Sequence, residues 1–286
     1  MFKFEVCVDS VVSALAAKEG GAHRVELCES LLEGGVTPSL GKIEAVVRAA
    51  YPLPVHVLIR PRAGDFCYSN EEFFIMLRDV RACRDCGAAG IVVGALLPDG
   101  TIDEPRMSHL LGFARYLGLS LTLHRSVDVS RDVVEAALAG ARVGVDYILT
   151  SGGEPNAEAG AEAICRMRKA LDALPVRPIP TLIAAGGVSS TNAAKIARIS
   201  GVTQLHGTAR PPEFLSGSMV FRKSPPVYMG GEKLNSPESE FGLRSATPES
   251  VSAIMRALFL GETGPEERQY APAPSGGGEA GETFLK

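Results

Sequence analysis

The sequence predicts a (β/α)8 barrel, the TIM-barrel fold of the α/β class, as a single domain over residues 1–260. Three observations lead to this prediction. Short apolar strands alternate with helical segments along the whole chain, which is the pattern of parallel βαβ units. The length of 286 residues fits one such barrel. An open, doubly wound sheet is the alternative, but no G-x-G-x-x-G turn and no shift of composition marks one.

The first half of the chain is predicted to hold four of the strands. In the strand and turn at 5–10, apolar residues alternate with Glu5 and Cys7, and in the next strand they alternate with Glu26 and Cys28. Alternation places these side chains on one face of each strand, and the helical segment between the strands makes them a parallel pair. The elements expected in this half are strands 5–8, 23–28, 55–59 and 90–94, and helices 11–18, 40–50, 69–87 and 104–117, the third of which begins with a capping box.

The second half repeats the pattern. Strands are expected at 120–124, 147–150, 181–185 and 203–206, with helices ending near 141, over 158–174 and over 191–199. After the eighth strand, a segment over 211–244 with Ser-Gly-Ser, Pro-Pro and Gly-Gly is expected to form a long loop over the barrel mouth. Thr247-Pro248-Glu249 then begins the last helix, which ends near 260. Residues 261–286 are rich in Gly, Pro, Ala and Glu, so we expect a disordered tail.

Charge and composition exclude several classes of protein. The net charge of −4 and the pI of 5.8 give no basic surface for nucleic acid or for an anionic membrane. Apolar runs are too short to span a bilayer, and the chain begins directly with a strand and not with a secretory signal, so we expect a cytoplasmic protein. In that compartment the six cysteines are expected to be thiols.

The predicted strand ends bring ionisable side chains to the mouth of the barrel, where TIM barrels carry their active sites. Glu26, Arg60, His124 and His206 all fall there, and such a set is typical of an acid/base, metal or anion site. The alternative is an ion-pair network that only stabilises the barrel, in which Glu26 and Arg60 neutralise each other. No lysine ends a strand, which argues against a Schiff-base aldolase.

Two cysteines form the second candidate site. Neighbouring parallel strands lie about 4.8 Å apart, so the inward-facing sulfurs of Cys7 and Cys28 are expected within reach of one ion. Two thiolates suit Cu(I) and suit Mg²⁺ or Ca²⁺ poorly. The alternative is that each is a small buried apolar residue. Cys83 and Cys86 end a helix, where the helix dipole disfavours thiolates, so we expect ordinary thiols there.

Further polar positions follow other strands. Gly186 and Gly187 begin the turn after the seventh strand, and such a backbone binds phosphate groups in many barrels, although a plain tight turn is equally consistent. Arg62 and Asp128 follow the third and fifth strands and are candidate contacts for an anionic substrate.

Several long motifs carry a family resemblance: EVCVDS at 5–10, VELCESLLEGGVTPS at 25–39, IRPRAGDFCYS at 59–69, VVGALLPDGTID at 92–103, LHRSVD at 123–128, ILTSGG at 148–153 and MVFRKS at 219–224. Together they resemble the CutC family of copper homeostasis proteins over about residues 3–260. The resemblance implies a cytoplasmic TIM barrel that forms homo-oligomers and handles copper. It also implies that Cys7 and Cys28 bind Cu(I).

Two functions therefore compete, with a structural or interaction protein as a third possibility. The first is a Cu(I)-binding copper homeostasis protein with Cys7 and Cys28 as the metal ligands. The second is an enzyme acting on a small anionic or sugar-like substrate. In that enzyme Glu26 and His124 would transfer protons, Arg60 would hold the anion, and His206 would polarise the substrate or bind a metal.

Overall fold

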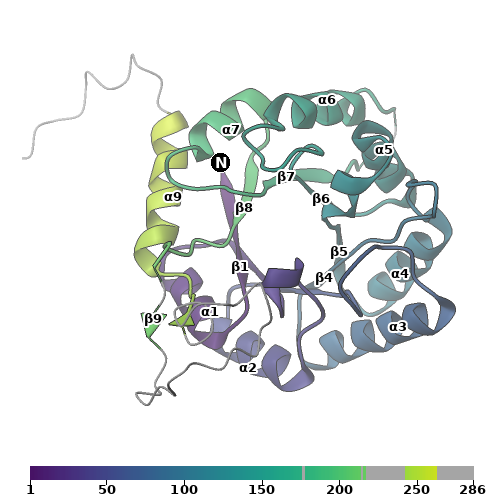
Figure 1. The fold of residues 1–286 in the computed structure, drawn as a ribbon, viewed down its shortest axis with the longest axis horizontal. Helices are drawn as coiled ribbons and strands as arrows, with labels where there is room; N and C mark the ends of the chain where they lie inside the picture. Colours follow the sequence, from purple (N-terminus) through teal and green to yellow (C-terminus); the bar gives the residue numbers. More distant parts are fainter. Residues whose placement is uncertain (176–177, 214, 217–241, 263–286) are drawn as a thin grey trace, which may run out of the picture.

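A computed structural model describes residues 1–175, 178–213, 215–216 and 242–262. Eight parallel strands close into a barrel in chain order, which confirms the predicted (β/α)8 fold (Figure 1). Each predicted strand is present, within a few residues of its expected ends. The barrel strands are β1 (Lys3–Val8), β2 (Arg24–Leu27), β3 (Val55–Leu58), β4 (Gly90–Val93), β5 (Ser120–Leu123), β6 (Tyr147–Thr150), β7 (Thr181–Ala185) and β8 (Gln204–Gly207).

The helices form a ring outside the barrel (Figure 1). The predicted capping box is present at Ser69 and Glu72, whose side chains bond each other's backbone N–H. Two helices begin later than predicted, because the Asn156 and Asn192 side chains hold turns ahead of them. The helices are α1 (Val11–Glu19), α2 (Leu40–Ala50), α3 (Asn70–Asp85), α4 (Glu104–Tyr116), α5 (Val133–Val143), α6 (Ala161–Asp172), α7 (Ala193–Ser200) and α9 (Pro248–Glu262), with 3-10 turns η1 (Leu31–Glu33) and η2 (Arg125–Val129).

The apolar core lies mainly between the strands and the helices. The space inside the barrel is different, because it holds only small apolar clusters and many buried polar side chains. Strand register brings these polar residues to the same levels: Cys7 pairs with Glu26 across β1 and β2, and Glu5 pairs with His206 across β1 and β8. Buried ionisable groups at matched levels are the framework of the candidate site.

The region after β8 is described in part. Within the loop predicted at 211–244, β9 (Leu215–Ser216) pairs with β10 (Gly242–Leu243), and residues 217–241 lie outside the described part of the chain. The last helix, α9, continues to Glu262, slightly beyond its predicted end near 260. The remainder of the predicted tail, 263–286, is also outside the described residues. None of the helices described is long and apolar enough to span a membrane.

Candidate functional site

A cavity of about 140 Å³ lies at the C-terminal ends of the strands, at the barrel mouth. We call it the mouth cavity. Six of the ten predicted site residues line it, and Leu31, Leu58, Phe66 and Leu149 supply apolar walls. The six are Cys7, Glu26, Cys28, Arg60, His124 and His206. The structure therefore brings the two sequence-predicted sites, the thiol pair and the ionisable set, into one pocket.

The thiols of Cys7 and Cys28 lie within hydrogen-bonding distance, with 3.7 Å between the sulfurs. Both residues are buried, at 5% and 2% exposure. The hydrogen bond with Cys28, assisted by one with His206, lowers the pKa of the Cys7 thiol to about 5 despite its burial. The same contact, together with burial, raises the pKa of Cys28 well above its usual value. At neutral pH the pair thus holds one proton, with Cys28 donating to the Cys7 thiolate.

His206 lies between two carboxyl groups. Its Nδ1 is 2.7 Å from Glu5, and its Nε2 is 3.4 Å from Glu26. Burial alone would lower the pKa of His206, but hydrogen bonds to Cys7 and Glu5 raise it well above the usual value. Burial also opposes ionisation of Glu5, but the charge of the adjacent Arg24 and the bond to His206 lower the pKa of that carboxyl. His206 is therefore an imidazolium held by a carboxylate.

Glu26 differs from Glu5 in its protonation. Burial, reinforced by the charge of the Cys7 thiolate, raises the pKa of Glu26 to about 8, so its carboxyl is protonated at neutral pH. One ligand atom from each of Cys7, Glu26 and His206 lies within 4.8 Å of the others. These three residues, with Cys28, are the groups in the cavity that could hold a metal ion.

Arg60 does not pair with Glu26, so the structure lacks the ion pair of the alternative interpretation, in which these two residues neutralise each other. Its guanidinium donates to the backbone carbonyls of Glu33, Gly35 and Gly64, at 2.7 to 3.0 Å, and lies over the ring of Phe66. Arg60 follows the end of β3, where its side chain meets the loop carbonyls before it can reach Glu26. The cation is buried without a carboxylate partner among the described residues.

His124 is a neutral hydrogen-bond donor. Its Nδ1 accepts the Ser126 N–H at 3.1 Å, so the neutral ring carries its hydrogen on Nε2. Burial, followed by the charge of Arg60, lowers the pKa of His124 to about 3. With so low a pKa the imidazole holds no second proton near neutrality, and the proton-transfer role of His124 stays a prediction.

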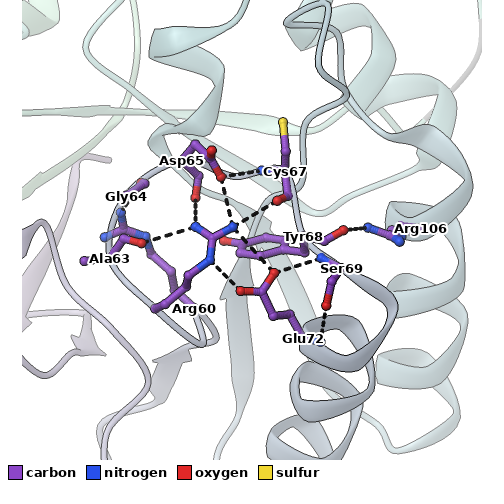
Figure 2. Close-up of polar contacts among 10 residues, drawn as sticks. Arg60, Ala63, Gly64, Asp65, Cys67, Tyr68, Ser69, Glu72 and Arg106 are labelled. Carbon is purple, nitrogen blue, oxygen red and sulfur yellow. Dashed lines mark hydrogen bonds and ion pairs between the residues drawn. The ribbon is translucent and has the colours of Figure 1, made fainter.

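Arg62 lies outside the mouth cavity. Its guanidinium binds Glu72, Asp65 and the carbonyl of Cys67, so its charge is already neutralised. Figure 2 shows Asp65, Cys67 and Glu72 gathered near the start of α3, with dashed lines marking their polar contacts. Arg62 thus anchors the β3–α3 loop, and the structure does not place it with the predicted anion site.

Asp128 also has a local role. It accepts hydrogen bonds from Thr150 and from the backbone of Ser151 and Gly153, and it pairs with Arg125. These contacts join η2 to the end of β6. Asp128 does not line the mouth cavity as described, whereas its partner Arg125 does.

Gly186 and Gly187 form the turn after β7, with φ of +97° and +67°. The Gly186 carbonyl accepts from Ala157 N–H, and the Gly187 carbonyl accepts from the Asn192 side chain. They do not line the mouth cavity as described, although a side chain added at Gly186 would meet Arg125. The positive φ angles of this turn are sufficient to explain why both positions are glycine.

Sequence reasoning placed Glu5 on the same strand face as Cys7 but assigned it no function, and it did not select Arg24. Arg24 lies two residues before Glu26 on the same strand face, so strand alternation could have found it. Arg125 comes directly after the end of β5, in a 3-10 turn, and was likewise given no role. Cys83 is buried and Cys86 half-buried, and burial raises the pKa of both thiols, in agreement with ordinary cysteines.

Comparison with known proteins identifies relatives across most of the chain. The family model described as the CutC family matches residues 2–211. A CutC family protein of Bacteroides fragilis is 42% identical over 230 residues, covering 80% of this chain and 88% of its own. One from Mesorhizobium japonicum is 41% identical over 232 residues, covering 81% and 85%.

A solved structure agrees with these relatives. The copper homeostasis protein CutC of Streptococcus agalactiae superposes with a TM-score of 0.66 at 27% identity, covering 73% of this chain and 99% of that one. The family match spans the barrel from β1 through β8, including both cysteines and every ionisable residue of the mouth cavity. The chain belongs to the CutC family.

Proposed function

We propose that this chain is a copper homeostasis protein that binds Cu(I) through the sulfurs of Cys7 and Cys28. The observation that supports the proposal is the 3.7 Å separation of these buried sulfurs. The family relatives support the link to copper, since a structural relative is named as a copper homeostasis protein. We further propose that the protein is cytoplasmic and self-associates, which fractionation and light scattering would test.

The donor set fits a soft monovalent ion. A typical zinc–sulfur bond is about 2.3 Å long, and twice that length exceeds the 3.7 Å between the two sulfurs. One ion that forms bonds of similar length could therefore bind both sulfurs without moving the strands. Thiolates select Cu(I) among the available metals. Cys7 is a thiolate before any metal arrives, and Cys28 would release one proton on binding.

A Cu(I) competition titration of the reduced protein against a chelator of known affinity tests this proposal. One tight equivalent is expected in the native protein and none in the Cys7→Ser/Cys28→Ser variant. The Cys83→Ser/Cys86→Ser variant is the matched control, because it removes two other thiols at the C-terminal end of α3, and it should keep the tight equivalent. Equal affinity in the native protein and the Cys7/Cys28 variant would refute the assignment.

A second candidate function is catalysis on a small anionic or sugar-like substrate. Glu26 favours it, because a buried carboxyl with a pKa of about 8 beside a thiolate can exchange a proton near neutral pH. The test is solvent deuterium incorporation into small acids and sugars, followed by NMR, for the native protein and Glu26→Gln. Incorporation that is equal in both proteins would count against Glu26 as the catalytic group.

A further inference from the structure

Two of the side chains that line the mouth cavity each carry a buried hydrogen-bond donor without a partner among the described residues: Arg60 at Nε and His124 at Nε2. Both residues are more than nine-tenths buried, at 6% and 5% exposure. A buried donor that lacks an acceptor is costly and uncommon in native proteins. Two of them in one cavity indicate that the cavity holds a ligand that accepts hydrogen bonds.

Neither donor can turn to another acceptor. The other nitrogens of Arg60 are fixed by the carbonyls of Glu33, Gly35 and Gly64. His124 is fixed by Ser126 N–H on Nδ1 and by the ring of Phe66, whose centroid is 4.9 Å away. Because Nδ1 is the acceptor, the hydrogen of the neutral ring must lie on Nε2. Both free N–H groups are therefore positioned before a ligand binds.

Charge around the donors favours an anion. Arg60 has no carboxylate partner among the described residues, and the half-exposed Arg125 lines the same cavity. Arg125 pairs with Asp128 through Nε and with Ser151 through one terminal nitrogen. Arg60 thus provides a positive charge beside the two donors that no described carboxylate contacts.

The size and the other walls restrict the ligand further. A volume of about 140 Å³ is well below the roughly 300–1,000 Å³ of pockets for drug-sized ligands. Leu31, Leu58 and Leu149 also line the cavity and provide apolar surface. These walls suit a short carbon skeleton better than an inorganic ion.

We propose that the mouth cavity binds a small organic acid, with its carboxylate accepting hydrogen bonds from Arg60 Nε and His124 Nε2 and its carbon skeleton against the leucine walls. The site is separate in its donors from the copper ligands and does not depend on the copper proposal. It assigns a function to the two buried donors that metal binding leaves unused. Charge-assisted hydrogen bonds of this kind are among the stronger ones in proteins.

The test uses butanoate as the probe, with butanamide as its uncharged counterpart and inorganic phosphate as a second anion. Binding is followed by calorimetry and by NMR of the His124 ring nitrogens, on the reduced protein with a copper chelator present. Butanoate is expected to bind and to shift the Nε2 signal, whereas butanamide is not. Tighter binding of phosphate than of butanoate would overturn the carboxylate assignment.

The informative variant is His124→Asn, which keeps an acceptor for Ser126 N–H and removes the Nε2 donor. It should weaken butanoate binding about tenfold or more, since a hydrogen bond to a charged group is lost. His109→Asn, on the exposed surface of α4, is the matched control and should bind normally. Cys7→Ser/Cys28→Ser should also bind butanoate normally, even if it loses copper.

Two further results would overturn the proposal. Absence of butanoate binding to the native protein would mean that water serves the two donors. Equal binding by the native protein and by a folded His124→Asn variant would mean that the acid binds elsewhere. Loss of copper binding in the cysteine variant with retained butanoate binding would separate this site from the metal site.

Discussion

The charge of His206 should control the ionisation of Cys7. We expect His206→Asn to raise the pKa of the Cys7 thiol, because the variant removes an imidazolium beside the thiolate. Asparagine keeps a side-chain donor near the position of Nδ1, so the contact with Glu5 need not be lost. The variant therefore changes charge more than it changes packing.

The expected size follows from distance. The ligand atoms of Cys7 and His206 lie within 4.8 Å of each other. At an effective dielectric constant of about 20, two unit charges at that separation interact by about 3 kcal/mol, or roughly two pKa units. The hydrogen bond with Cys28 is the larger cause of the low pKa and remains in the variant. The pKa of Cys7 should therefore rise substantially without reaching the value of a free thiol.

Thiolate ultraviolet absorbance against pH measures this directly. The Cys7 signal is the difference between each protein and the same protein carrying Cys7→Ser. His109→Asn, which removes an exposed histidine of α4, should leave the titration of Cys7 unchanged. If Cys7 titrates at the same pH in the native protein and in His206→Asn, the imidazolium does not stabilise the thiolate and the charge assignment of the site is wrong.

Three further predictions concern stability. In the folded protein, the pKa of His56 is about 4 and that of His124 is about 3, against about 6.5 in the unfolded chain. Their contribution to the free energy of unfolding is therefore complete above pH 6.5, and below that pH it should fall by up to about 1.4 kcal/mol per pH unit for each histidine. Equal free energies of urea unfolding at pH 7 and pH 5 would contradict this. Gly94→Ala should cost about 1–3 kcal/mol, because the added Cβ would lie 2.7 Å from Nδ1 of His124, whereas Gly112→Ala in α4, with open space around it, should be neutral or stabilising. Ser69→Ala should cost about 1 kcal/mol in the same assay by removing the α3 cap, and an unchanged midpoint would argue against the capping box.

The inward faces of the strands could be predicted because a strand has a period of two residues. Once Cys7 faced inward, Glu5 had to face inward as well, and the same holds for Glu26 and Arg24. What alternation cannot give is the partner across the barrel. Glu5 contacts His206 because β1 pairs with β8, a relation between opposite ends of the described barrel that depends on closure.

The positions after the strands were less predictable. Arg60 and Arg62 follow the same strand, yet one lines the mouth cavity and the other lies in the β3–α3 loop. Their directions are set by loop carbonyls and by Glu72, and none of these follows a sequence period. The tautomer of His124 was unpredictable for the same reason, because it depends on one backbone N–H of the η2 turn, that of Ser126.

The charges inside the barrel bear on which ion the site would accept. In the cluster at β1, β2 and β8, two cations and two anions balance, and two further groups keep their protons. The cations are Arg24 and His206, the anions are Glu5 and Cys7, and the protonated groups are Glu26 and Cys28. Arg60 is outside this cluster, since its guanidinium is held by loop carbonyls. Uncompensated buried charge is strongly unfavourable, so an exchange that preserves this balance is preferred. Replacing the Cys28 proton by Cu(I) preserves it. A divalent ion would add one positive charge unless Glu26 also lost its proton, so the charge balance favours a monovalent ion independently of the softness of sulfur.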